Sequence, residues 1–213
     1  ILSYTTIFFY KHNYAHNLIV HAFGITTFLY YYKKKNLNKE FIKLLILFTI
    51  FFCGLLILNN HDDFSYYHLT YSLGLTENKL FLGLGNLGHG YRHHSSLFFL
   101  NSILYLPFIK FYLFHSVGWI TLVFVNFIIL NYILKKKNLD NFDFEFIFYL
   151  ISFVYINIKF YRVGAYGTDI AGQLILFITL PIIYSICKDR YNISKVKTNI
   201  EVIILLITYL VTI

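Results

Sequence analysis

Charged residues are scarce in this sequence. Asp, Glu, Lys and Arg together make up only 13% of its 213 positions, against about 25% in an average soluble domain. Hydrophobic residues account for 58% and aromatic residues for 21%, and the mean hydropathy is +0.61. This composition excludes a disordered protein and disfavours an ordinary soluble domain, because too few polar residues remain to cover its surface. Much of the surface is therefore expected to face a lipid bilayer.

Methionine is absent, and cysteine is limited to Cys53 and Cys187. The lack of methionine, together with Ile as the first residue, suggests an internal piece of a longer reading frame. We therefore treat residues 1–213 as one transmembrane domain of a longer chain. Each cysteine stands alone in an apolar run, which predicts a small buried hydrophobe and gives no paired spacing for a zinc or redox motif.

Basic residues outnumber acidic ones by 18 to 10, giving a net charge of +8. Such a charge can indicate a nucleic-acid partner, but here the lysines stand in blocks at the ends of apolar runs. The main blocks lie at residues 33–43, 135–137 and 188–197. This pattern is typical of the cytoplasmic loops of membrane proteins, so we expect a bilayer and no nucleic acid as partner.

The apolar runs between these blocks predict an all-α integral membrane bundle of about six spans. The candidate spans are residues 13–32, 44–60, 111–134, 146–158 and 170–187, with a further run from Val202. A full crossing at residues 95–109 would place the later lysine block opposite the first one, so this run is expected to be an interfacial or re-entrant helix, ended by Pro107 and Lys110. The external parts are then residues 61–110 and 159–169.

The long external segment holds a cluster of ionisable side chains, most of the histidines among them. Six of the nine histidines lie between residues 61 and 115, and the segment also contains Asp62, Asp63, Glu77 and Arg92. In a protein this apolar, such a cluster at the membrane surface indicates partners or a function. A solvated loop is the alternative.

Two adjacent carboxylates, Asp62 and Asp63, follow a predicted span directly. Either one could act as a general base or hold Mg²⁺ or Mn²⁺ through its oxygens, and His68 joins them as a candidate catalytic residue. The alternative for either aspartate is the N-cap of a helix over residues 64–73.

A glycine-rich stretch over residues 83–96 contains Arg92, His93 and His94. Backbone amides, an arginine and a helix that opens at Ser95 together suit a phosphate or pyrophosphate. The two histidines could bind the substrate or a metal, serve as acid and base, or simply form hydrogen bonds. A structural glycine-rich turn is the competing interpretation.

The short external segment adds Arg162 and Asp169. If the spans pack into a bundle, Arg162 could share an anionic ligand with Arg92, with Asp169 as their counter-ion. Thr168 and Asp169 could instead cap the following helix.

Three stretches resemble a family of bacterial polytopic membrane proteins that is similar to the C-type (GT-C) glycosyltransferase superfamily. They are residues 62–71 (DDFSYYHLTY), residues 83–98 (GLGNL, then Arg92, then SSLF) and residues 166–169 (YGTD). The resemblance implies a many-span enzyme that takes a sugar from a polyprenyl-phosphate carrier. It also implies an aspartate of the first large external loop as base or metal ligand, which here is Asp62 or Asp63.

The expected function is thus a glycosyltransferase-like protein of the bacterial inner membrane, acting in cell-envelope biosynthesis on a lipid-linked sugar. The alternative is a transporter or flippase of an anionic lipid or solute, with the arginines as binding groups. A transporter is expected to carry polar residues and Gly or Pro breaks near mid-span in two related halves, and the sequence shows neither.

Overall fold

The computed structural model describes residues 2–57, 61–81, 83–92, 95–136, 144–160 and 169–188. Within these ranges every regular element is helical. The α-helices are α1 (Leu2–Thr6), α2 (Tyr14–Lys35), α3 (Asn38–Phe52), α4 (Leu69–Glu77), α5 (Ser96–Ile103), α6 (Ser116–Lys136), α7 (Phe144–Lys159) and α8 (Asp169–Lys188). Among the described residues β pairing is limited to one isolated bridge, between Leu106 and Lys110. The predicted all-α class is confirmed.

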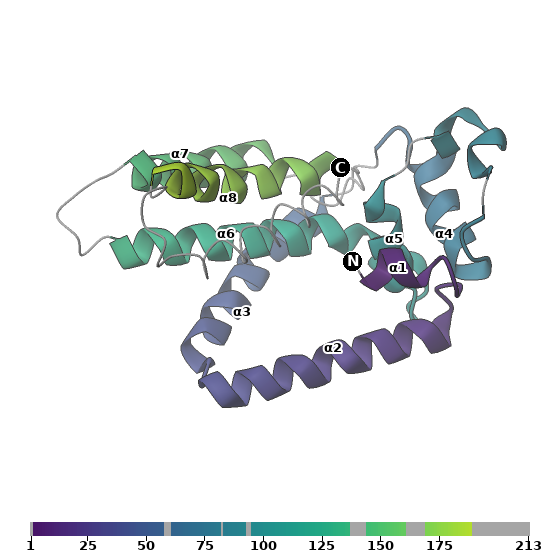
Figure 1. Cartoon of the computed structure of the whole chain (residues 1–213), viewed down its shortest axis with the longest axis horizontal. Coiled ribbons are helices and arrows are strands. Elements are labelled where there is room, and N and C mark those ends of the chain that lie inside the picture. Colours follow the sequence, from purple (N-terminus) through teal and green to yellow (C-terminus); the bar gives the residue numbers. More distant parts are fainter. Residues whose placement is uncertain are drawn as a thin grey trace.

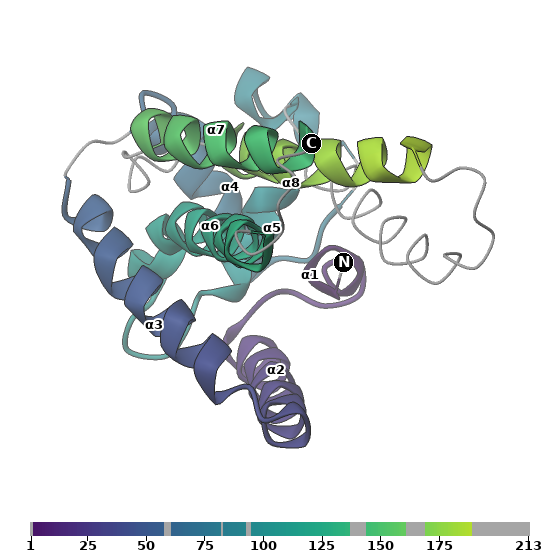
Figure 2. The same ribbon diagram turned by 90° about the vertical axis from the view of Figure 1, so that its left-hand side faces the viewer.

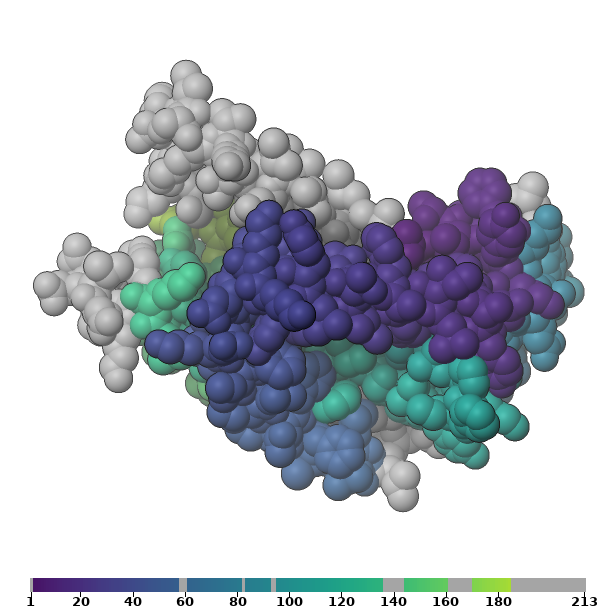
Figure 3. Space-filling model, turned by 90° about the horizontal axis from the view of Figure 1, so that it is seen from below, coloured from purple at the N-terminus to yellow at the C-terminus, as the bar shows by residue number. Residues whose placement is uncertain are grey.

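The helices form two groups. Helices α6, α7 and α8 run side by side, with α3 packed on α6, while α1, α4 and α5 gather at the other end of the molecule (Figures 1 and 2). Helix α2 runs along the edge and covers much of the face seen in Figure 3. The C-terminal ends of α2, α6 and α8 lie at one end of the molecule, and α4 and α5 lie at the opposite end (Figure 1).

The core between α6, α7 and α8 is aliphatic and aromatic. Its buried members are Leu122, Val125, Ile129, Tyr149, Ile156, Phe160, Leu174 and Ile178. A polar pair lies within this layer: the side-chain amide of Asn157 donates to Asn126 Oδ1 at 2.8 Å, and Asn126 donates to the carbonyl of Leu122 at 2.9 Å. These bonds satisfy a buried amide that would otherwise be costly, so they hold α6 and α7 together.

A second core joins α1, α4 and α5. It consists of Ile7, Tyr71, Leu75, Phe98 and Phe99. The Tyr71 ring stacks on Phe98 with 4.6 Å between centroids. This cluster fixes the position of α4 and, with it, of the segment that leads into α4.

A buried polar contact fastens the N-terminal segment to α5. His12 Nδ1 lies 2.6 Å from Ser102 Oγ. The Ser102 hydroxyl donates to the carbonyl of Phe99 at 3.0 Å, so the ring donates Nδ1–H to Ser102. The Asn17 amide donates to the carbonyls of His12, Ser102 and Tyr105 at 2.8, 2.8 and 2.9 Å. We call His12, Asn17 and Ser102 the polar clamp; all three are completely buried.

Most helices begin and end near the limits of the predicted apolar runs, but both ends of α3 differ from the prediction. Helix α2 ends where Asn36 adopts a left-handed conformation with φ 46°, and α3 begins at Asn38, earlier than predicted. Helix α3 also ends at Phe52, in place of a span over residues 44–60, and a 3₁₀ turn follows at Cys53–Leu56. The predicted break near Pro107 is confirmed, because α5 ends at Ile103 and the next helical turn starts at Phe111.

One helical stretch among the described residues, Phe111–Lys135, is long and apolar enough to cross a membrane. Among the longer helices, α3 and α7 have only 15 and 16 residues, and the described apolar part of α8 is limited to Ile170–Tyr184. Tyrosine, histidine and asparagine lower the hydropathy of α2. The expected bundle of about six spans therefore has no support from helix length and composition. The expectation that Cys53 is buried is wrong, since its side chain is exposed beside the 3₁₀ turn.

Candidate functional site

The candidate site lies where the chain enters α4. Residues Phe64–His68 form a π-helical turn, and α4 continues it from Leu69. The Asp63 carbonyl accepts the N–H groups of Tyr67 at 3.1 Å and His68 at 3.2 Å. The wider π turn carries Asp63 and His68, five positions apart, toward the same side. Such turns are rare and are frequent at functional sites.

Three side chains converge here, and we call His61, Asp63 and His68 the His–Asp–His cluster. One potential ligand atom from each residue lies within 4.8 Å of the other two. His61 Nδ1 is 3.7 Å from Asp63 Oδ2, and it accepts the Asp63 N–H at 3.2 Å. The rings of His61 and His68 stack with 5.2 Å between centroids. Two imidazoles and one carboxylate at this separation form a donor set that could hold a metal ion.

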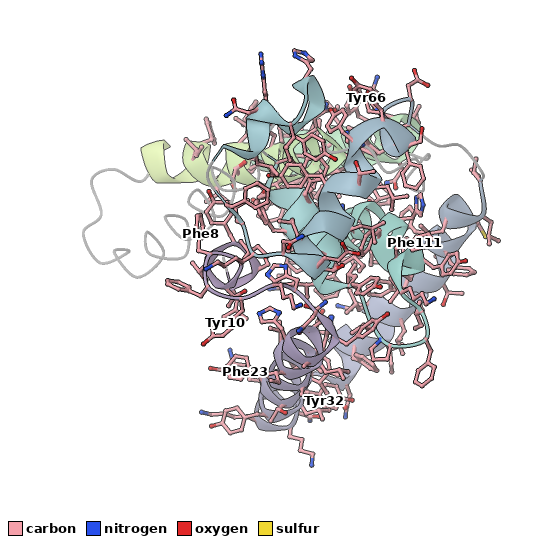
Figure 4. All side chains as sticks on the ribbon, turned by 90° about the vertical axis from the view of Figure 1, so that its right-hand side faces the viewer. Phe8, Tyr10, Phe23, Tyr32, Tyr66 and Phe111 are labelled. Atoms are coloured by element: carbon pink, nitrogen blue, oxygen red, sulfur yellow. The ribbon has the colours of Figure 1, made fainter. Side chains whose placement is uncertain are left out.

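Helix α5 positions the buried member of the cluster. His68 is 1% exposed, and its ring packs on Phe98 at 5.4 Å and on Tyr67 at 4.4 Å. His61 and Asp63 are more than 40% exposed. Tyr66, in the same π turn, is 67% exposed and lies at the margin of the molecule in Figure 4. The cluster thus has a fixed inner wall and an open outer side.

The two aspartates differ in their surroundings. Asp63 occupies the N-cap position of the π turn, but its side chain makes no capping hydrogen bond, so the N-cap interpretation does not describe this carboxylate. Asp62 is exposed in the turn before it. The structure therefore brings Asp63 and His68 of the predicted catalytic set together and leaves Asp62 beside them, facing solvent.

The glycine-rich stretch packs directly against the π turn. A Cβ added to Gly90 would lie only 2.4 Å from Tyr67 Cγ, so a glycine is required there for close packing. The Tyr91 hydroxyl donates to Thr70 Oγ1 at 3.1 Å. Arg92 is exposed, and its Nε donates to the Gly85 carbonyl at 3.4 Å. The structural interpretation thus accounts for Gly90, and Arg92 keeps a solvent-facing guanidinium.

The predicted cap at the start of α5 is confirmed. Ser95 has an extended backbone, and its Oγ accepts the Leu97 N–H at 3.4 Å. His93, His94 and Arg162 lie outside the described residues, as does the predicted sharing of a ligand by Arg92 and Arg162. Asp169 is placed as the first residue of α8, but its side chain is outside the described part.

The polar clamp was missed by sequence reasoning. Burial lowers the pKa of His12 from 6.5 to about 4, with a smaller contribution from the neighbouring His16, although a hydrogen bond that the ring donates to the Ser3 backbone opposes this shift. The His12 and His16 rings stack at 4.7 Å. The sequence offers one signal of this contact, the pair His12 and His16 spaced i, i+4 near the apolar N-terminus. Nothing in the sequence around Ser102 indicates that it is the partner of His12.

Tyr71, which borders the site, is also held neutral. Burial, with a smaller contribution from Tyr4, raises its pKa to about 12. This phenol is therefore a packing group, unsuited to proton transfer near neutral pH. The carboxylates and imidazoles of the π turn are the better candidates for chemistry.

No family model matches the sequence, and neither a curated protein nor a solved structure is significantly similar to it.

Proposed function

We propose that this chain is a membrane-embedded, glycosyltransferase-like protein that transfers a sugar from a polyprenyl-phosphate carrier at the external face of the bacterial inner membrane. The observation that carries the proposal is the pair of adjacent carboxylates, with Asp62 exposed and Asp63 beside two imidazoles. This carboxylate pair directly precedes the π turn that leads into α4, and α4 lies at the end of the molecule opposite the C-terminal ends of α2 and α6 (Figure 1).

Exposed apolar side chains support a membrane location with several spans. Ile19 and Phe23 of α2 are 70% and 67% exposed, and Ile158 of α7 is 71% exposed. Phe8, Tyr10 and Phe23 all point away from the body in Figure 4. With a rise of 1.5 Å per residue, the 22 residues of α2 extend about 33 Å, comparable to the roughly 30 Å hydrocarbon core of a bilayer. We therefore retain a multi-span bundle as part of the proposal.

The orientation follows from the charges. The lysines at the C-terminal end of α2 and the start of α3 lie at the same end of the molecule as the end of α6, where Lys43 Nζ donates to Asn131 Oδ1 at 3.0 Å. Under the positive-inside rule this end faces the cytoplasm. The π turn and α4 then face outward, where a lipid-linked sugar is presented.

The roles of the two aspartates differ in this mechanism. Asp62 takes the proton from the acceptor hydroxyl, because its carboxylate is accessible to an incoming substrate. The acceptor oxygen forms a bond to the anomeric carbon, and the bond from that carbon to the carrier phosphate breaks, so the phosphate departs with the electron pair. Arg92, exposed on the same loop 30 positions further along the chain, neutralises that phosphate. Stabilising developing charge in this way is commonly the largest catalytic contribution.

The transporter alternative has one observation in its favour. Asn126 is completely buried within α6 and bonded to Asn157 of α7. A polar pair inside a helical layer can line a transport path. Because each amide here bonds to the neighbouring helix or its own backbone, we assign it to helix packing.

A reconstitution experiment separates the two functions. The full-length protein in vesicles is given a radiolabelled sugar on polyprenyl phosphate together with acceptor lipid, and the products are separated by chain length and charge. Label transferred to the acceptor supports the proposed function. Label that crosses the bilayer while still bound to its carrier would support transport and contradict sugar transfer.

A further inference from the structure

The His–Asp–His cluster has the composition and geometry of a transition-metal site. We infer that His61, Asp63 and His68 bind one divalent ion of the zinc class and leave a coordination position open to water or substrate. The inference rests on ligand geometry, so it goes beyond the proposed sugar transfer and does not depend on it.

The distances suit a small ion. Zinc bonds to nitrogen and oxygen of about 2.0–2.2 Å place the donors of a tetrahedral site about 3.3–3.6 Å apart. The separation between His61 Nδ1 and Asp63 Oδ2 is already 3.7 Å, and no pair of potential ligand atoms is more than 4.8 Å apart. Rotation of the two exposed side chains closes the remaining gap. An ion bound at His61 Nδ1 takes the place of the Asp63 N–H, which that atom now accepts.

The backbone prepares the site. The π turn ties His68 to Asp63 through the hydrogen bond from the His68 N–H to the Asp63 carbonyl. The ring of His68 is held by Phe98 and Tyr67, so one ligand is fixed before the ion arrives. The other two ligands stand on the open side, which provides an entry path. Three protein ligands with an open fourth position characterise catalytic zinc sites, whereas structural sites are closed by four.

The ligand types favour zinc over magnesium. Imidazole suits Zn²⁺, Fe²⁺, Ni²⁺ and Cu²⁺, while Mg²⁺ selects oxygen ligands and retains its waters. Two of the three donors here are imidazoles. The carboxylates alone led us to expect Mg²⁺ or Mn²⁺. Because the fold adds His61 and His68 to Asp63, the ion expected at this cluster is a softer one.

A binding titration tests the inference. The purified full-length protein in detergent is stripped with a chelator and titrated with Zn²⁺ against a chromophoric competitor, and separately with Co²⁺ while the visible spectrum is recorded. We expect one ion per chain and a Co²⁺ spectrum of four or five ligands. Asp63→Asn and His61→Gln should each weaken Zn²⁺ at least about tenfold.

Two exposed residues outside the cluster provide matched controls. Asp62→Asn removes the neighbouring carboxylate, and His89→Gln removes a histidine of the same loop; both should leave the Zn²⁺ affinity within about twofold. Zn²⁺ should also raise the melting temperature of the wild type and of the controls, because it binds only the folded chain. It should not do so for Asp63→Asn, whose metal-free chain should still unfold in one transition near the metal-free wild-type temperature, and that transition distinguishes lost binding from misfolding.

Three results would overturn the inference. The first is the absence of stoichiometric Zn²⁺ binding by the wild type. The second is an equal loss of affinity in Asp62→Asn and Asp63→Asn. The third is competition by Mg²⁺ at concentrations similar to those of Zn²⁺. Zinc binding without any sugar transfer would refute the proposed function and leave the metal site standing, whereas sugar transfer without zinc binding would do the reverse.

Discussion

His12 and Ser102 stand 90 positions apart in the chain, and their side chains meet in a buried hydrogen bond of 2.6 Å. The contact joins the segment before α2 to α5, the helix whose Phe98 also supports His68. Through this connection the N-terminal region and the candidate site share one packing unit. A disturbance of the polar clamp is therefore expected to reach the π turn.

The first prediction concerns the pH dependence of stability. The folded chain holds the pKa of His12 at about 4, below its ordinary value of 6.5, so the unfolded chain takes up the proton first as the pH falls. The stabilisation is complete above pH 6.5 and is lost as the pH falls toward 4, by up to about 3 kcal/mol. Thermal unfolding measured across this range should show the loss.

The variant His12→Gln isolates this contribution, because glutamine keeps hydrogen-bonding capacity and does not titrate. Its melting temperature should vary less with pH in that window than the melting temperature of the wild type. His89→Gln, at an exposed histidine, should retain the wild-type profile. Identical pH profiles for the wild type and His12→Gln would show that His12 does not remain neutral in the fold.

The second prediction tests the packing of the glycine-rich stretch. Gly90→Ala places a methyl group against Tyr67, and overpacking of this kind costs about 1–3 kcal/mol. Gly74 provides the control, because a Cβ there meets nothing within 4 Å. Gly74→Ala in α4 should be neutral or stabilising by up to about 1 kcal/mol, since alanine favours helix. Similar melting temperatures for the two variants would contradict the close approach of Gly90 and Tyr67.

Sequence reasoning predicted the long helices and missed the local geometry of the site. The apolar runs around α6, α7 and α8 and the cap at Ser95 were readable because periodic hydrophobicity and capping residues are local signals. The π turn was not, since its wider geometry is stabilised by tertiary contacts such as that of Phe98 with His68. Nor could local patterns pair His12 with a serine 90 positions away.

The third prediction separates ligand binding from folding at Arg92. The side chain is exposed, and among the described residues it makes one long hydrogen bond, to Gly85, so Arg92→Lys should change the free energy of unfolding by less than about 0.5 kcal/mol. Loss of the planar, bidentate guanidinium should weaken polyprenyl-phosphate binding by about 1–3 kcal/mol. Binding is measured by equilibrium dialysis against short-chain carrier, with Lys79→Gln as a control at another exposed cation of the loop. A parallel loss of stability and binding would indicate a structural arginine.

The fourth prediction is the orientation in the membrane. In a background with Cys53 and Cys187 replaced by serine, an impermeant maleimide applied from outside should label Glu77→Cys at the end of α4. It should not label Lys136→Cys at the end of α6. The reverse pattern would invert the proposed orientation, and labelling of both positions would mean that the chain crosses the bilayer once more between them.

The central claim is that Asp62 acts as the base in sugar transfer. Asparagine keeps the size and much of the hydrogen bonding of aspartate but accepts no proton. Transfer of labelled sugar from polyprenyl phosphate by the full-length protein should therefore fall about 10²- to 10⁴-fold in Asp62→Asn, with carrier binding retained. Glu77→Gln, at an exposed carboxylate of the same loop, should transfer sugar at the wild-type rate. Full activity in Asp62→Asn, or no transfer by the wild type, would contradict the account.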